Sequence, residues 1–132
     1  MTVFCTYCSA KKDRSQGELP ALQRYRSHRI ESVYVAAMSL GLKFLILSGK
    51  YGILEPSDTI PYYDHLLQSS EVSEHSKRVA VQLEALGVKD LIFFAGSLSD
   101  DENLKPYLDC IKLSSQKAGF ELKFVDLPTN DA

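Results

Sequence analysis

The stretch KFLILSGKYGILEPSDTIPYYD, at residues 43–64, contains the pattern that indicates the fold class. It begins with a nearly continuous apolar run, which is typical of a strand covered on both faces by helices. A long segment rich in Gly, Pro and Tyr follows and continues to Leu67. Connections of this length are uncommon in compact domains and are often functional. We therefore expect a buried strand that delivers a polar loop to a functional site.

Four short apolar runs alternate with longer stretches of helical period along the chain. The runs are TVFCTYC (2–8), LKFLIL (42–47), DLIFFAG (90–96) and FELKFVDL (120–127). The helical stretches are 22–40, 71–86 and a third, with an ambiguous start, that buries Leu104, Tyr107, Leu108 and Ile111 and ends near Gly119. This alternation predicts an α/β fold: a three-layer sandwich around a central, mostly parallel four-stranded sheet, with the last strand at an edge.

The composition fits one globular domain spanning residues 1–132, with 45% apolar and 24% charged residues. The net charge of −2 argues against binding of nucleic acid by phosphate neutralisation alone. The charge is uneven, however, because residues 9–34 contain six basic side chains and three acidic ones. We therefore expect a local anion site near the N-terminus.

The cysteines predict a reducing environment. Cys5, Cys8 and Cys110 are an odd number, and we find neither a cleavable apolar leader nor an apolar run long enough to cross a membrane. Cys5 and Cys8 form a CxxC pair, but no second Cys/His pair completes a tetrahedral zinc site. On one strand they would also point to opposite faces. We expect a cytoplasmic protein with reduced thiols, no metal or cofactor and no membrane partner.

Parallel strands bring their carboxyl ends to one edge of the sheet, and ligands bind at this edge in such folds. The first loop at this edge offers a small hydroxyl and three basic side chains. These residues are Ser9, Lys11, Lys12 and Arg14. We expect them to bind phosphate or carboxylate. The alternative is a solvated loop that is merely basic.

The loop after the second strand begins with closely spaced glycines. Gly49 and Gly52 bracket Lys50 and Tyr51, so that the chain can turn sharply and still present two polar side chains. We expect Ser48, both glycines and Tyr51 to bind the ligand, and Lys50 to take part in catalysis.

The same loop continues with a compact set of functional groups. Tyr63, Asp64 and His65 supply a stacking ring, a carboxylate and a titratable imidazole. We expect Tyr63 to bind the ligand, and Asp64 and His65 to act with Lys50 in catalysis. The alternative is that the aliphatic residues of the loop fill the core and its tyrosines cover the rim.

The loop after the third strand also begins with small residues, which let a ligand approach the backbone. Gly96 and Ser97 are therefore candidate ligand-binding positions. Asp100, Asp101 and Glu102 follow them and could hold magnesium, because hard cations take carboxylate oxygens. Acidic residues in this position more often begin a helix, where the helix dipole favours them. We adopt the second interpretation and expect no metal site.

The start of the helical stretch 22–40 is basic. Arg24 and His28 are four residues apart and share a face of the predicted helix. They either line the opening of the site or form an ordinary polar helix face.

Two of these segments resemble a known group of proteins. CSAKK at 8–12 and LSGKYGILEPSDTIPYYD at 47–64 are similar to motifs of the YaaA peroxide-stress family and of the uracil-DNA-glycosylase-like domain of archaeal archaeosine synthases. Arg26-Ser27-His28 is similar to a Ser-His element of the same group. The resemblance implies a uracil-DNA-glycosylase-like α/β fold and a nucleobase, nucleotide or nucleic acid as partner.

Three functions are consistent with these patterns. The first is an enzyme that acts on a nucleobase or nucleotide, at an N-glycosidic bond or a modified base, with Asp64 stabilising positive charge on the sugar. The second is a non-catalytic protein that binds a nucleotide or single-stranded nucleic acid through the same loops. The third is a docking interface formed by the loop at 49–66. The oligomeric state stays open.

Overall fold

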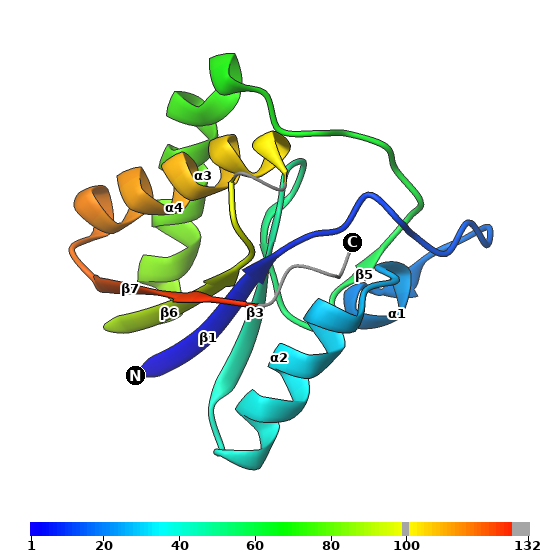
Figure 1. Cartoon of the computed structure of the whole chain (residues 1–132), viewed down its shortest axis with the longest axis horizontal. Coiled ribbons are helices and arrows are strands. Elements are labelled where there is room, and N and C mark those ends of the chain that lie inside the picture. Colours follow the sequence, from blue (N-terminus) through cyan, green and yellow to red (C-terminus); the bar gives the residue numbers. More distant parts are fainter. Residues whose placement is uncertain (99–100, 128–132) are drawn as a thin grey trace.

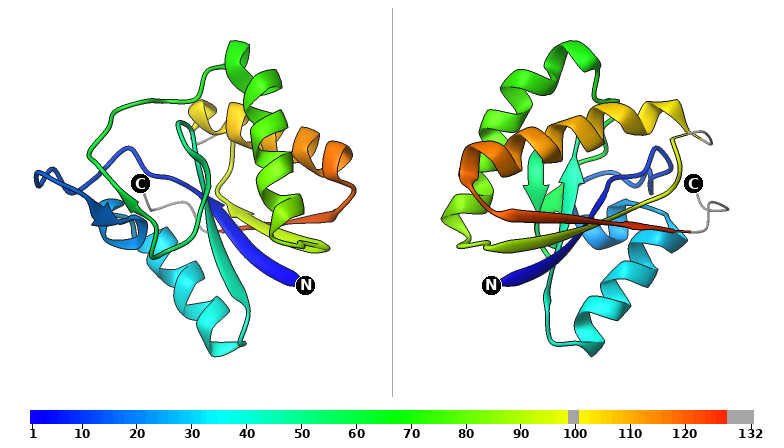
Figure 2. Two further views of the ribbon diagram at one scale, coloured as in Figure 1. Left: turned by 180° about the vertical axis from the view of Figure 1, so that it is seen from behind. Right: turned by 60° about the vertical axis from the view of Figure 1, so that its left-hand side comes forward.

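The structure is a computed structural model that describes residues 1–98 and 101–127. A twisted central sheet carries helices on both faces (Figures 1 and 2). α2 (His28–Ser39) lies on one face, and α3 (Val72–Ala85) and α4 (Lys105–Ala118) lie on the other. The predicted α/β class is confirmed.

The central sheet contains five strands in the order β4-β3-β1-β6-β7. They are β4 (Gly52–Leu54), β3 (Lys43–Ser48), β1 (Thr2–Tyr7), β6 (Asp90–Ala95) and β7 (Glu121–Asp126). β1 lies in the middle and pairs in parallel with β3 and β6, and β6 pairs in parallel with β7. The four apolar runs therefore form four parallel strands, and the last of them is an edge strand as predicted.

The expectation of a four-stranded sheet is wrong, because the segment after β3 adds a fifth strand. β4 runs antiparallel to β3, with Ser48 opposite Gly52, so the sheet is mixed. Gly52 has a φ of 77°, a left-handed conformation that glycine adopts without the steric cost of a side chain. Farther along, β5 (Thr59–Ile60) pairs with β2 (Leu19–Pro20) in a separate antiparallel ribbon. The long connection is thus partly extended structure.

The helix expected over 22–40 is interrupted. α1 (Ala21–Arg24) ends before Tyr25, whose backbone is extended, with φ −85° and ψ 127°. α2 begins only after Ser27, whose side chain accepts a hydrogen bond from the amide of Ile30 and caps the helix. Arg24 and His28 therefore do not share one helix face, because the break lies between them.

The other two helices agree with the predicted stretches. α3 follows a short 3₁₀ turn, η1 (Ser69–Glu71), and ends one residue before its expected end. α4 follows η2 (Glu102–Leu104), carries Pro106 in its first turn, and ends at Gly119 with a φ of 77°. None of the described helices is long and apolar enough to cross a membrane.

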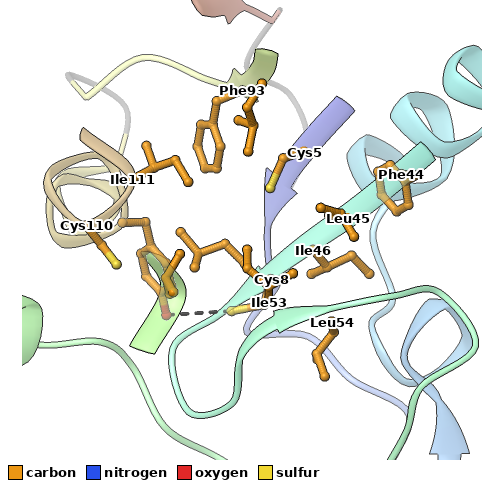
Figure 3. Close-up of a cluster of buried hydrophobic side chains, with 14 of the residues drawn as sticks. Cys5, Cys8, Phe44, Leu45, Ile46, Ile53, Leu54, Phe93, Cys110 and Ile111 are labelled. Carbon is orange, nitrogen blue, oxygen red and sulfur yellow. Dashed lines mark hydrogen bonds between the residues drawn. The ribbon is translucent and has the colours of Figure 1, made fainter. Parts of the chain in front are cut away.

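The core between the sheet and α4 is shown in Figure 3 and contains Cys5, Phe93 and Ile111, which are fully buried. The thiol of Cys8 donates a hydrogen bond to the phenol of Tyr107 in α4, with a sulfur–oxygen distance of 3.6 Å. The expectation that Cys5 and Cys8 point to opposite faces is wrong. Strand alternation does not extend to Cys8, because β1 ends at the residue before it.

The three cysteines are buried free thiols. Burial raises the pKa of Cys110 to about 11, and burial together with the neighbouring Cys110 raises the pKa of Cys5. Both thiols therefore stay protonated near neutral pH and act as small apolar side chains of the core.

Candidate functional site

The loop after β1 is held by backbone pairing with the segment that follows α1. Lys12 forms an antiparallel bridge with Tyr25. The amide of Asp13 donates to the carbonyl of Arg24 at 2.8 Å. These contacts fix the backbone of the loop at Lys12, in the middle of the basic segment.

The side chain of Arg24 connects this loop to the long segment after β3. It is fully buried. Its guanidinium donates to the carbonyls of Asp13 (2.7 Å), Ser15 (3.0 Å), Gly17 (2.7 Å) and Ile60 (3.1 Å). Because Ile60 belongs to β5, one side chain holds both halves of the predicted site together. Sequence reasoning placed Arg24 on a helix face and missed this role.

Ser48 organises the turn between β3 and β4. Its buried hydroxyl accepts hydrogen bonds from the amides of Lys50 (3.1 Å) and Tyr51 (3.0 Å). Nε2 of His75, in α3, donates to the carbonyl of Ser48 at 2.8 Å, and the side-chain amide of Gln82 donates to the carbonyl of Tyr51 at 3.2 Å. The helix behind the turn therefore supports the backbone that presents Lys50 and Tyr51.

Gly49 lies where no side chain fits. A Cβ at this position would be 2.7 Å from the phenol oxygen of Tyr107 and 3.1 Å from the amide nitrogen of Leu67. The turn can approach α4 this closely because residue 49 has no side chain.

Tyr63 occupies the centre of the site. Its phenol hydrogen-bonds the hydroxyl of Ser48 at 2.9 Å and makes a short hydrogen bond to the phenol of Tyr25. Only 5% of Tyr63 is exposed. Burial raises the pKa of Tyr63 and of Tyr25 far above the usual range, so both phenols stay neutral.

Two lysines from different loops approach the ring of Tyr63. Nζ of Lys12 lies 4.6 Å from the ring centroid, and Nζ of Lys50 lies 5.8 Å from it. The two ammonium groups are therefore at most about 10.4 Å apart. Lys12 also lies 5.8 Å from the ring centroid of Tyr25. The expectation that the first two loops form one composite site is consistent with this geometry.

The three residues expected to act in catalysis have different surroundings. Asp64 is exposed and close enough to Lys12 to oppose the lowering of its pKa by burial. His65 instead pairs with Glu71 of η1, with 3.0 Å between Nε2 and Oε1. Neighbouring residues of an extended segment point in different directions, which explains this divergence. Asp64 therefore lies toward Lys12, whereas His65 is held by Glu71 of η1.

Comparison with known proteins adds a family assignment. Residues 3–118 match the model of DUF6884, a family of unknown function. The chain belongs to the DUF6884 family. Comparison with curated proteins and with solved structures returned no match. The matched region contains Lys12, Lys50 and Tyr63, so both halves of the candidate site lie within the DUF6884 region.

The remaining predicted residues of the first loop have different surroundings in the DUF6884 protein. Ser9 is buried, and its hydroxyl donates to the carbonyl of Lys11 at 2.7 Å, so it serves the loop backbone. The side chain of Lys11 is exposed. The guanidinium of Arg14 lies 5.4 Å from the ring centroid of Tyr62, farther out on the rim.

The third loop of the DUF6884 protein begins at the same edge. Gly96 and Ser97 follow β6, the strand that pairs with β1. Asp101 caps η2 by accepting from the amide of Asn103 at 2.9 Å, which is the helix-starting role expected for these acids. Asp100 lies outside the described residues. Within residues 1–98 and 101–127, no three His, Cys, Asp or Glu side chains are grouped to hold a metal ion.

Two further side chains beneath the rim were missed by sequence reasoning. The thiol of Cys8 lies close enough to influence the pKa values of Lys12 and Tyr63. The phenol of Tyr107 accepts a hydrogen bond from the amide of Leu67 at 3.2 Å. The helical spacing predicts that Tyr107 is a core residue. The spacing does not show which groups its phenol oxygen contacts.

Proposed function

We propose that this protein binds a nucleotide at the carboxyl edge of its sheet, with the phosphate between Lys12 and Lys50. The observation that carries the proposal is the convergence of these two ammonium groups on the ring of Tyr63, from loops that follow neighbouring parallel strands. Two cations beside one buried ring, with the carboxylate of Asp64 near Lys12, favour an anionic ligand.

The state of Lys12 also favours an anion. Its side chain is half-buried, and burial lowers its pKa. An anion bound beside the amine would stabilise the ammonium form and raise this pKa again. Ligand binding would therefore relieve an electrostatic cost that the unliganded site carries.

Tyr51 supplies a surface for the base. Its ring is half-buried and stands edge-on to Tyr63, with 5.2 Å between the ring centroids and an interplanar angle of 82°. Stacking of a base on an aromatic side chain contributes about 1–3 kcal/mol and tolerates different bases. Tyr63 is too deeply buried to stack and instead forms the floor of the site.

Thermal unfolding with a ligand panel tests this function. Nucleoside monophosphates should raise the unfolding midpoint, because a ligand that binds only the native state stabilises it by mass action. The corresponding nucleosides and inorganic phosphate should each raise it less. Lys50→Met should reduce the shift, whereas Lys77→Met, in the exposed part of α3, should not. No shift with any monophosphate, or an equal shift with phosphate alone, would reject the proposal.

A second candidate function is cleavage or exchange at an N-glycosidic bond, and the position of Asp64 favours it. This exposed carboxylate lies near Lys12, at the rim where a sugar would follow the phosphate. A carboxylate there could stabilise the positive charge that develops on the sugar. Release of free base from nucleotides or from uracil- or deazaguanine-containing oligonucleotides by the wild type, and not by Asp64→Asn, would support it. No release by the wild type would reject it.

A further inference from the structure

Lys12 differs from the lysines that form ion pairs in this protein. Lys43, Lys77 and Lys105 each hold a carboxylate at 2.7–2.9 Å. In the described part of the chain, Lys12 forms no ion pair. Its amine lies instead against two aromatic rings, 4.6 Å from the centroid of Tyr63 and 5.8 Å from that of Tyr25.

The amine is also held in place. The bridge between Lys12 and Tyr25 fixes one side of the loop, and Arg24 binds the carbonyls that follow it. The hydrogen bond between the phenols of Tyr25 and Tyr63 fixes the two rings on which the side chain packs. A positioned amine loses less entropy when it reacts than an amine on a mobile surface loop.

The amine of Lys12 loses its proton more readily than the amine of a fully solvated lysine. Burial lowers the pKa of Lys12, whereas Cys8 and Asp64 act in the opposite direction and keep it from falling further. Lysines of this kind, partly desolvated and close to a proton acceptor, serve as nucleophiles toward carbonyl groups.

We propose that Lys12 forms an imine with the aldehyde of a phosphorylated sugar, held by its phosphate at Lys50. The idea rests on the proposed function, because a sugar phosphate is the part of a nucleotide that the two lysines would recognise.

The step balances without an oxidant or a reductant. The lone pair of Nζ attacks the carbonyl carbon, a C–N bond forms, and the oxygen takes up a proton. The carboxylate of Asp64, which influences the pKa of Lys12, would accept a proton from the attacking nitrogen and return it to the departing hydroxyl. Overall, an ammonium group and an aldehyde give an iminium ion and water.

Reductive trapping with ribose 5-phosphate and sodium cyanoborohydride tests the proposal. Reduction of the imine adds the mass of the sugar phosphate less one oxygen, and peptide mapping locates the adduct. We expect Lys12 to be labelled about tenfold or more faster than Lys77 or Lys105, which are exposed and paired. Ribitol 5-phosphate, which has no aldehyde, should give no adduct, and ribose, which has no phosphate, should react more slowly.

Variants separate a reactive role from a structural one. Lys12→Arg keeps the positive charge and the contact with the tyrosine rings but cannot form an imine. It should keep the unfolding midpoint of the wild type and lose the adduct at residue 12. Lys77→Arg is the matched control, and it should leave labelling of Lys12 unchanged. Equal labelling of Lys12 and the exposed lysines would overturn the proposal.

Calorimetric titration with nucleoside monophosphates, run in parallel, distinguishes the two proposals. If nucleotides bind and ribose 5-phosphate gives no adduct at Lys12, the imine is rejected and the nucleotide site stands. If the adduct forms without nucleotide binding, the imine is supported and the nucleotide site is rejected. If neither occurs, both are rejected.

Discussion

The hydroxyl groups of Ser48 and Tyr63 are 2.9 Å apart and join the end of β3 to the segment that returns over it. The hydroxyl of Ser48 also accepts hydrogen bonds from the amides of Lys50 and Tyr51. One buried oxygen therefore links Tyr63 to the turn that carries these two residues. Tyr25 extends the same network toward Lys12. The candidate site is therefore built on a buried polar network, and its parts should depend on one another.

The first prediction concerns the phenol of Tyr63. Tyr63→Phe removes one oxygen and leaves the buried hydroxyls of Ser48 and Tyr25 without that partner. It should lower the free energy of unfolding by about 1–3 kcal/mol, measured by urea denaturation. Tyr62→Phe is the control, because Tyr62 is exposed and should change stability by less than about 0.5 kcal/mol. Equal effects of the two substitutions would contradict the central position of Tyr63.

Arg24 should be among the most sensitive positions. Arg24→Met fills much of the same volume but leaves four carbonyl groups without their donor, so we expect a loss of at least about 3 kcal/mol in the free energy of unfolding. Arg26→Met is the control, since the exposed side chain of Arg26 forms an ion pair with Asp13. A small loss for Arg24→Met would mean that water or another side chain replaces the guanidinium.

Gly49 and Tyr107 should be energetically coupled. Gly49→Ala places a methyl group 2.7 Å from the phenol oxygen of Tyr107, and Tyr107→Phe removes that oxygen. In a double-mutant cycle, the alanine should therefore cost less in the phenylalanine background, by at least about 0.5 kcal/mol. Tyr107→Phe should remove only part of the cost of the alanine, because the amide nitrogen of Leu67 remains 3.1 Å from the new methyl group. If the free-energy changes of the two substitutions simply add, the turn must move away from α4 when residue 49 is alanine.

His75 should make stability depend on pH. Burial lowers its pKa below the ordinary value of about 6.5, and this outweighs its hydrogen bond to the carbonyl of Ser48. Between the two pKa values the unfolded chain binds more protons than the folded chain, so stability falls as the pH drops below about 6.5. His75→Gln keeps a donor for that carbonyl but does not titrate. Urea denaturation should show that His75→Gln loses less stability than the wild type as the pH drops. An equal loss in the two proteins would assign the pH dependence to another group.

The sequence predicted that the loops carrying Lys12 and Lys50 would lie side by side, and in the structure both lysines approach the ring of Tyr63. Lys12 and Lys50 follow apolar runs that read as parallel strands, and parallel neighbours end at one edge. β4 escaped prediction because Gly52–Leu54 is too short to show a period. Such a short strand is recognised only by its pairing with β3, which the sequence does not show.

The break between α1 and α2 shows the same limit. The spacing of Arg24 and His28 suits a continuous helix, but the bridge between Lys12 and Tyr25 and the carbonyls that Arg24 binds hold Tyr25 in an extended conformation. Contacts between distant residues override local periodicity here. For the same reason the sequence could not show that His65, next to Asp64, pairs with Glu71.

The central claim is that Lys12 and Lys50 together bind the phosphate of a nucleotide. Its most direct test is calorimetric titration of nucleoside monophosphates into the wild type and into Lys12→Met/Lys50→Met, at low and at moderate salt. Binding to the wild type should weaken as salt rises, because exposed charges are screened. Loss of both charges should weaken binding by more than about tenfold and remove most of the salt dependence. Equal affinity in the two proteins, or affinity that salt does not change, would contradict the account.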